Sequence, residues 1–212
     1  MTLQLLVIAK QPWPGRVKTR LCPPCTPEQA AAIASASLAD TLQAVTATPA
    51  ARRTLVISGE YPPPAGWRLV GQRGGALGER LAHAFADTAR PGWSTLLIGM
   101  DTPQATPSHL LAVAGSLDRF DAVLGPAEDG GWWALALRDP TAARVLSGVR
   151  MSTVDTYAQT LRALRGLGLT VAAGASLRDV DTAADAHVVA AQAPDGRFAA
   201  AVARHVPVEA SL

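Results

Sequence analysis

The feature that most restricts the fold is a repeated exchange between short apolar runs and segments with helical periodicity. The first run, Leu3–Ala9, is almost continuously apolar and contains Val and Ile, which is typical of a strand buried on both faces of a parallel sheet. The segment after it predicts a helix with Thr26 as N-cap, Pro27 at the first helical position and Gln29 completing a capping box. Alternation of this kind predicts an α/β protein with a mainly parallel sheet and helices on both faces.

The same alternation continues to the end of the chain. Further strands are predicted over 53–59, 68–71, 94–100, 121–126, 132–138 and 169–174, and further helices over 75–89, 106–117, 152–168, 181–193 and 193–206. The helix at 152–168 is expected to be capped by Ser152 or Thr153. In such sheets ligands collect beyond the carboxyl ends of the strands, so every loop that follows a strand is a candidate site loop.

Length and composition limit the class of protein. The 212 residues and the 49% hydrophobic content fit one domain, which we expect to span 1–212. A net charge of +2 is too small to indicate binding to nucleic acid or to a membrane surface. No apolar run approaches the roughly 20 residues that cross a bilayer, and the first residues lack the features of a signal peptide. The protein is therefore predicted to be cytoplasmic.

The loop after the first strand, 9–24, carries unpaired positive charge. It contains Lys10, Arg16, Lys18 and Arg20, and the first acidic residue of the chain is Glu28. Arg offers bidentate geometry to phosphate oxygens and Lys acts as a point charge, so the pattern favours phosphate binding. A surface loop with scattered charges stays open as the alternative.

The backbone of this loop is shaped in advance. Pro12 and Pro14 fix two backbone angles, and Gly15 allows close approach of another group. The spacing matches neither the Walker loop nor the Rossmann glycine pattern.

Carboxylates follow two other predicted strands. Asp101 comes at the end of the strand at 94–100, and Asp179 and Asp181 follow the strand at 169–174. A carboxylate beside a phosphate loop indicates a bridging hard cation, Mg²⁺ or Mn²⁺. A local Asp-Thr-Pro turn would also explain Asp101, and capping of the next helix by Asp181 or Thr182 would explain that pair.

Two glycine-rich segments are further candidates. Gly74, Gly75 and Gly78 precede and enter a helix, where the backbone can approach a flat or anionic ligand; a flexible connection is the alternative. In 125–137, acidic residues lie on a turn between two apolar runs and are followed by two tryptophans, of which only one can face a pocket. Ordinary turn residues would give the same pattern.

Cys22 and Cys25 have C-x-x-C spacing. A structural zinc site would need two further ligands, and the histidines are isolated. A redox pair stays open, because a helix N-terminus after Cys25 would lower the pKa of its thiol. The two prolines between the cysteines and the neighbouring phosphate loop favour two cysteines without a special role.

Several segments resemble one bacterial family. AKQPWPGRVKTRL resembles its opening signature A-K-x-P-x-P-G-x-x-K-T-R-L, LLIGMDTPQ its I-G-x-D-x-P, GQRGGALGERL its Q-x-G-x-x-L-G-x-R, and GPAEDGGWW its G-P-A-x-D-G-G with an aromatic pair. The family groups largely uncharacterised GT-A-like proteins with arsenosugar-biosynthesis glycosyltransferases. Its fold is shared with the 2-phospho-lactate and molybdenum-cofactor guanylyltransferases. The resemblance implies a nucleotide-diphospho-sugar transferase (GT-A) Rossmann-like fold.

The resemblance also implies roles for individual residues. Phosphate binding is expected at Ala9, Lys10, Gly15, Arg16, Lys18 and Arg20, nucleoside binding at Gln72, Gly75, Gly78 and Arg80, and metal binding at Asp101 and Asp181. An acceptor or sugar pocket is expected at Glu128, Asp129, Gly130, Gly131 and Trp132. Asp129 would orient or deprotonate an acceptor hydroxyl, and Lys18 would also act in the reaction. Pro103 and Met151 depart from the family pattern, which removes the second Asp of D-x-D and a stacking tryptophan.

These observations favour a metal-dependent transferase that takes a nucleotide or nucleotide sugar and a small-molecule acceptor, with Mg²⁺ or Mn²⁺ as cofactor. A GT-A-type glycosyltransferase is the first interpretation. A nucleotidylyltransferase that releases pyrophosphate is the second, and a non-catalytic nucleotide-binding protein is the third. Assembly of identical copies stays open.

Overall fold

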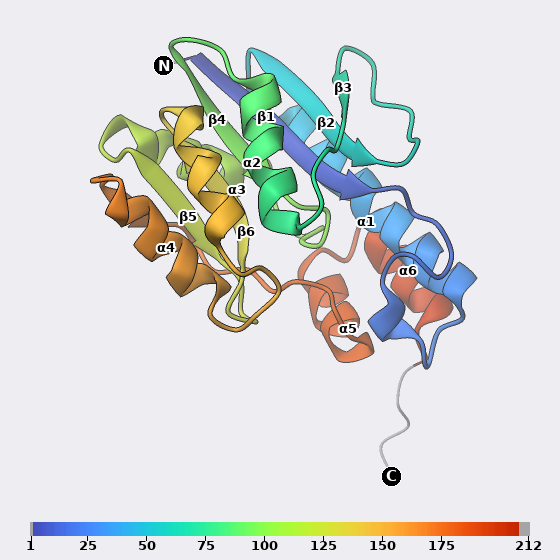
Figure 1. Ribbon diagram of the computed structural model, residues 1–212. Helices are drawn as coiled ribbons and strands as arrows, with labels where there is room; N and C mark the ends of the chain where they lie inside the picture. Colours follow the sequence, from blue (N-terminus) through green and yellow to red (C-terminus); the bar gives the residue numbers. More distant parts are fainter. Residues whose placement is uncertain (1, 208–212) are drawn as a thin grey trace.

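The computed structural model describes residues 2–207 (Figure 1). The strands are β1 (Thr2–Lys10), β2 (Arg52–Ser58), β3 (Arg68–Gly71), β4 (Trp93–Ile98), β5 (Ala122–Pro126), β6 (Trp132–Leu137) and β7 (Val171–Ala173). The α-helices are α1 (Pro27–Ala47), α2 (Leu77–Thr88), α3 (Pro107–Gly115), α4 (Thr156–Gly166), α5 (Ala183–Gln192) and α6 (Arg197–His205), and the 3₁₀ segments are η1 (Thr19–Leu21), η2 (Ser116–Asp118) and η3 (Pro140–Gly148).

The seven strands form one sheet in the order β3-β2-β1-β4-β6-β5-β7. Strand β6 is antiparallel to both of its neighbours, and every other pairing is parallel. Ile98 of β4 lies opposite Ala134, and Pro126 of β5 lies opposite Trp132. The amino end of β6 therefore lies at the same edge as the carboxyl ends of the other strands. This arrangement confirms the predicted mainly parallel α/β fold, in the nucleotide-diphospho-sugar transferase form.

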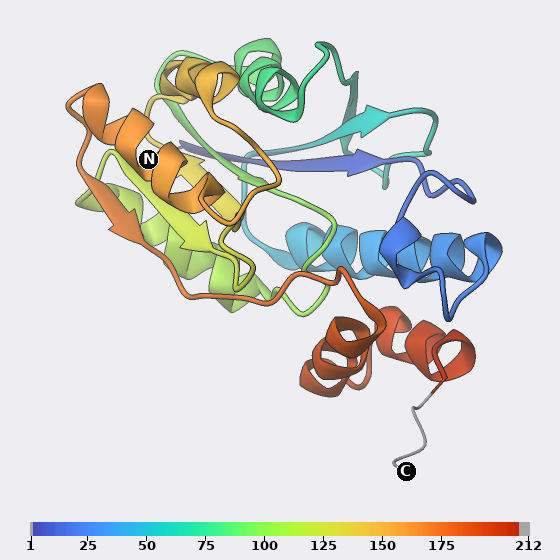
Figure 2. The same ribbon diagram turned by 60° about the horizontal axis from the view of Figure 1, so that its bottom comes forward.

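Helices cover both faces of the sheet, as Figure 2 shows edge-on. Alternate residues of β1 enter different cores. Leu5 and Val7 pack in the cluster that contains side chains of α1 and α3, and Leu6 packs in the cluster that contains side chains of α2, η3 and α4. A strand buried on both sides needs apolar residues at successive positions, which explains the continuous run read from the sequence. None of the helices within residues 2–207 is long and apolar enough to cross a membrane.

A third core joins the two ends of the chain. Leu21 and Ile33 from the first part of the chain pack with Val180 and Phe198 from the last part. The backbone amide of Phe198 donates a hydrogen bond of 2.8 Å to Asp40 Oδ2 on α1. Figure 2 shows α6 lying against α1, with α5 beside α6. The chain between β7 and α5 is thereby held beside the cationic loop.

Most helix starts agree with the sequence. Thr26 and Gln29 form the predicted capping box, and Thr106 and Thr182 cap α3 and α5. The predicted cap at Ser152 or Thr153 is wrong, because α4 begins only at Thr156. Ser152 has a φ of 58°, so the chain bends there before the helix starts. The short segment η3 was not predicted.

The structure favours the interpretation that Cys22 and Cys25 have no special role. Both thiols are free, and Cys25 is buried with its Sγ 3.5 Å from the carbonyl oxygen of His205. Burial, and to a lesser extent Cys22, raises the pKa of the Cys25 thiol. The expectation that the helix N-terminus lowers this pKa is wrong, because desolvation of the thiolate dominates.

Gly78 offers a test of the packing between α2 and η3. A Cβ at this position would lie 2.3 Å from the carbonyl oxygen of Leu146. We expect Gly78→Ala to lower the free energy of unfolding by about 1–3 kcal/mol despite its better helix propensity, because the contacted atoms are backbone. Urea unfolding measures the effect. Gly115→Ala is the control, since nothing lies within 4 Å of its Cβ; equal stability of the two variants would contradict the packing.

Candidate active site

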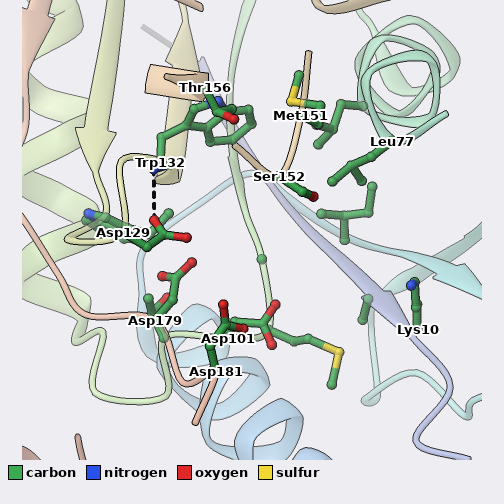
Figure 3. A pocket seen from close by; sticks show the side chains of 18 of the residues that line it. Lys10, Leu77, Asp101, Asp129, Trp132, Met151, Ser152, Thr156, Asp179 and Asp181 are labelled. Carbon is green, nitrogen blue, oxygen red and sulfur yellow. Dashed lines mark hydrogen bonds between the residues drawn. The ribbon is translucent and has the colours of Figure 1, made fainter. Parts of the chain in front are cut away.

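A cleft of about 720 Å³ opens at the carboxyl edge of the sheet. Its walls come from the loop after β1, the end of β4, the β5–β6 hairpin, the loop before α4 and the segment before α5. Figure 3 shows Asp101, Asp129, Asp179 and Asp181 gathered on one side, with Trp132, Met151 and Leu77 on the other. The reversed direction of β6 brings its first residues to this edge.

Lys18 points into the carboxylate side of the cleft. Its backbone is left-handed, with φ 48° and ψ 37°, and its side chain is only 6% exposed. The ammonium Nζ contacts the carboxylate of Asp101 and donates to the carbonyl oxygen of Val180. The backbone amide of Val180 in turn donates 2.9 Å to the carbonyl oxygen of Asp101. One side chain thus joins the cationic loop, the end of β4 and the segment before α5.

A second ion pair lies beside the first. Arg20 Nη1 lies 2.7 Å from Asp181 Oδ2. The capping box of α5 uses Thr182 and Asp185, so the carboxylate of Asp181 is not needed to cap the helix. Both carboxylates that were predicted as metal ligands are therefore paired with cations that were predicted to bind phosphate.

Asp179 lies beside these pairs, and no cation among residues 2–207 forms an ion pair with it. Its Oδ1 is buried and finds no hydrogen-bond partner in the described part of the chain. Burial, followed by the charges of Asp101 and Asp129, raises the pKa of Asp179 to about 7, and Lys18 opposes the rise only in part. A buried, unpaired carboxylate is a place where a cation would be stabilised.

The β5–β6 hairpin holds its carboxylate in place. Asp129 Oδ1 accepts a hydrogen bond of 2.8 Å from the amide of Gly131. Arg178 spans from the hairpin to α5, with Nη2 2.5 Å from Glu128 Oε2 and Nη1 3.2 Å from Asp185 Oδ1. Glu128 therefore braces the hairpin and does not line the cleft. Gly130 does not line the cleft either. It has a φ of 89°, and its lack of a Cβ allows the backbone of Val154 to approach closely.

The two tryptophans of β6 differ in exposure. Trp133 is 3% exposed and donates 2.9 Å to the carbonyl oxygen of Ala175. Trp132 is half-buried, and its Nε1 donates 3.1 Å to Thr160 Oγ1. Trp132 lies with Met151 along the apolar wall of the cleft (Figure 3). One tryptophan thus forms the wall while the other packs in the core.

The predicted nucleoside residues divide into two groups. Gln72 and Arg80 line the cleft. The Gln72 amide nitrogen is already bound to the carbonyl oxygens of Ala9 and Val56, at 2.7 and 3.1 Å, so only its oxygen is free to meet a ligand. Gly75 and Gly78 are not in the cleft lining, and Gly78 packs on η3 instead.

The predicted phosphate residues also divide. Ala9, Lys10, Arg16, Lys18 and Arg20 line the cleft, whereas Gly15 does not. Among the residues from 2 to 207, neither Lys10 nor Arg16 has an acidic partner. The loop therefore presents two free cations to the cleft besides the two that are paired.

Sequence reasoning missed two features of the site. Asp179 was noted beside Asp181 in the sequence, but nothing in one sequence marks it as the buried carboxylate. Arg178 precedes it, and its contacts with Glu128 and Asp185 appear only in the fold. Within the described chain, no three His, Cys, Asp or Glu side chains form a ready-made metal cluster.

Comparison with protein families identifies the chain's relatives. Residues 31–153 match the family described as "Uncharacterized protein conserved in bacteria (DUF2064)". The chain belongs to this family. No protein of curated function matches the sequence. The narrower likeness to arsenosugar-biosynthesis glycosyltransferases stays an interpretation of the motifs.

Solved structures share the fold. A protein of Desulfovibrio desulfuricans, described as a candidate nucleotide-diphospho-sugar transferase, is 26% identical with a TM-score of 0.81, over 96% of this chain and 98% of its own. The 2-C-methyl-D-erythritol 4-phosphate cytidylyltransferase of Thermus thermophilus is 16% identical with a TM-score of 0.56, over 92% and 100%. Glucosyl-3-phosphoglycerate synthase of Mycobacterium tuberculosis, solved with Mn²⁺ and UDP, is 13% identical with a TM-score of 0.51, over 84% and 70%.

The raised pKa of Asp179 predicts a pH-dependent stability. Because this pKa is about 7 in the folded protein and 3.8 in an unperturbed aspartate side chain, the folded state binds the proton more tightly between these values. The proton on Asp179 therefore makes its full contribution to the free energy of unfolding below about pH 4. This contribution falls by about 1.4 kcal/mol per pH unit as the pH rises, and it is lost above about pH 7. Between pH 5 and pH 8, the free energy of unfolding of the metal-free wild-type protein should therefore fall by more than that of the Asp179→Asn variant. Identical profiles in urea unfolding would contradict this, and Asp118→Asn, an exposed aspartate outside the cleft, is the control.

Proposed function

We propose that the protein is a metal-dependent transferase that uses a nucleotide-activated sugar, a GT-A-type glycosyltransferase. The observation that carries the proposal is the interleaving of Lys18 and Arg20 with Asp101, Asp179 and Asp181 at the carboxyl edge of the sheet. Such a site offers cations for a diphosphate and oxygen ligands for a metal ion in the same few ångströms. The fold shared with nucleotide-diphospho-sugar transferases supports it.

The residues present fit a hard divalent cation. The buried Oδ1 of Asp179 has no hydrogen-bond partner among residues 2–207, and the side chain of Asp101, which lines the cleft, is 48% exposed. Asp101 and Asp181 would hold Mg²⁺ or Mn²⁺, with Asp179 beside them, since such ions prefer carboxylate oxygens. The Mn²⁺ and UDP in the Mycobacterium tuberculosis synthase support this assignment. When bound, the ion supplies charge neutralisation of the departing diphosphate.

The protein's own cations would act on the same diphosphate. Lys18 and Arg20 lie next to the carboxylates, and Lys10 and Arg16 line the cleft without acidic partners among residues 2–207. As the bond between the sugar carbon and the phosphate oxygen breaks, negative charge grows on that oxygen, and nearby cations stabilise it. The nucleoside would lie toward Gln72 and Arg80, which line the cleft beside the loop.

Asp129 is the proposed base. Its carboxylate lines the cleft, is held by the amide of Gly131, and lies on the same side as the carboxylates of Asp101 and Asp179 (Figure 3). The acceptor oxygen attacks the sugar carbon, the bond to the diphosphate breaks, and the proton of the acceptor hydroxyl passes to Asp129. The ring of Trp132 forms the adjoining wall and would keep water from the sugar carbon.

A nucleotidylyltransferase is the second candidate. The free cations Lys10 and Arg16 give the cleft enough positive charge for a triphosphate as well as a diphosphate. In that reaction an acceptor attacks the α-phosphorus and pyrophosphate leaves. The shared fold with a cytidylyltransferase is compatible with either reaction.

A panel of nucleotide sugars and nucleoside triphosphates, each with Mg²⁺ or Mn²⁺, tests the proposal. A ligand bound by the folded state must raise the melting temperature, and product analysis then separates release of a nucleoside diphosphate from release of pyrophosphate. We expect a nucleotide sugar to bind and to be consumed. Absence of any nucleotide binding would contradict both reactions, and binding without turnover would favour the non-catalytic interpretation.

Two variants separate binding from chemistry. Arg20→Ala removes a diphosphate contact, so we expect at least about tenfold weaker nucleotide binding. Asp129→Asn removes the base, so we expect binding within about threefold of wild type and turnover reduced at least about 100-fold. Asp118→Asn is the matched control, because this aspartate lies outside the cleft. Normal turnover of Asp129→Asn would remove Asp129 from the mechanism.

A further inference from the structure

Lys18 is held in an unusual state for a residue expected to meet a ligand. Its side chain is 6% exposed, whereas the carboxylate that it contacts, Asp101, is 48% exposed. Its left-handed backbone, with φ 48°, is sparsely populated by residues other than glycine. The ammonium contacts Asp101 and the carbonyl oxygen of Val180. It therefore lies on the side of the cleft where the carboxylates gather.

The charges around Lys18 are nearly balanced without any ligand. Lys18 is paired with Asp101 and Arg20 with Asp181, whereas neither Asp179 nor Asp129 has a cation partner within the described residues. A divalent cation that binds the Asp101 oxygen contacted by Lys18, Oδ1, must displace the ammonium. The displaced ammonium then loses both its carboxylate and its carbonyl partner, and an unpaired charge next to a newly bound cation is unfavourable.

A diphosphate removes this cost. Phosphate oxygens give the displaced ammonium a new anionic partner, and they also complete the ligands of the divalent cation. The two ligands therefore favour each other's binding, and linkage requires the effect to be reciprocal.

We infer that Lys18 is an internal counter-cation that occupies the place of the divalent ion in the metal-free protein. The site then takes the divalent cation and the diphosphate as a pair and binds either one weakly alone. This inference rests on the proposed function of the cleft, but it concerns the order in which the site can be filled.

Calorimetric titration with Mn²⁺, with inorganic pyrophosphate and with their equimolar complex tests the inference without knowledge of base or sugar. For the wild-type protein we expect the complex to bind at least about tenfold more tightly than Mn²⁺ or pyrophosphate alone. In Lys18→Met, Mn²⁺ alone should bind at least about tenfold more tightly than in wild type, because Asp101 no longer has a competing ammonium. The advantage of the complex over Mn²⁺ alone should shrink in the same variant.

Lys10→Met is the matched control. It removes the same charge from the same cleft, but Lys10 contacts no carboxylate within the described residues. We expect its affinity for Mn²⁺ alone to stay within about threefold of wild type. Equal affinity of wild type and Lys18→Met for Mn²⁺ alone would overturn the inference and leave the proposed function standing.

The melting temperature of Lys18→Met will show whether this variant folds. If it does not, the titrations of the wild-type protein still test the inference. Wild-type protein that binds Mn²⁺ alone as tightly as the complex would overturn the inference. Absence of binding in all three titrations would instead remove the metal–diphosphate site on which the proposed function depends.

Discussion

A single buried ammonium group joins three of the segments that form the walls of the cleft. Lys18 comes from the loop after β1, and its partners come from the end of β4 and from the segment before α5. Those partners are 83 and 162 residues away along the sequence, so the contact exists only because the parallel strands end at one edge and the third core packs Val180 with Leu21 and Ile33. The positions of the other charged residues in the cleft depend on these contacts of Lys18.

The sheet topology explains why acids and cations alternate around the cleft. Strands β1 and β4 are neighbours, so the cationic loop and Asp101 emerge side by side. Strand β6 runs in the opposite direction, which brings Asp129 and Trp132 to the same edge at its start. The segment before α5 lies along the hairpin through the Ala127–Leu177 bridge and the Arg178 ion pairs. Four separate segments thus place their charges around one cleft.

The sequence predicted the strands, the capping box at Thr26 and the gathering of site loops, because apolar runs and caps are local signals. It did not predict the reversal of β6, since an apolar run does not reveal strand direction. It did not single out Asp179 either, because the burial of its Oδ1 depends on contacts far along the chain. Gly78 was assigned to the nucleoside by motif, yet its missing Cβ makes room for the backbone of Leu146. In a single sequence, a glycine needed for packing cannot be told from a glycine needed for ligand binding.

The most direct test of the account is a crystal structure with Mn²⁺ and a nucleoside diphosphate, read from the anomalous signal of manganese. The account predicts a manganese peak beside Asp101, with Lys18 turned from that carboxylate to the phosphates. A peak elsewhere, or a Lys18–Asp101 ion pair that persists beside bound diphosphate, would contradict it.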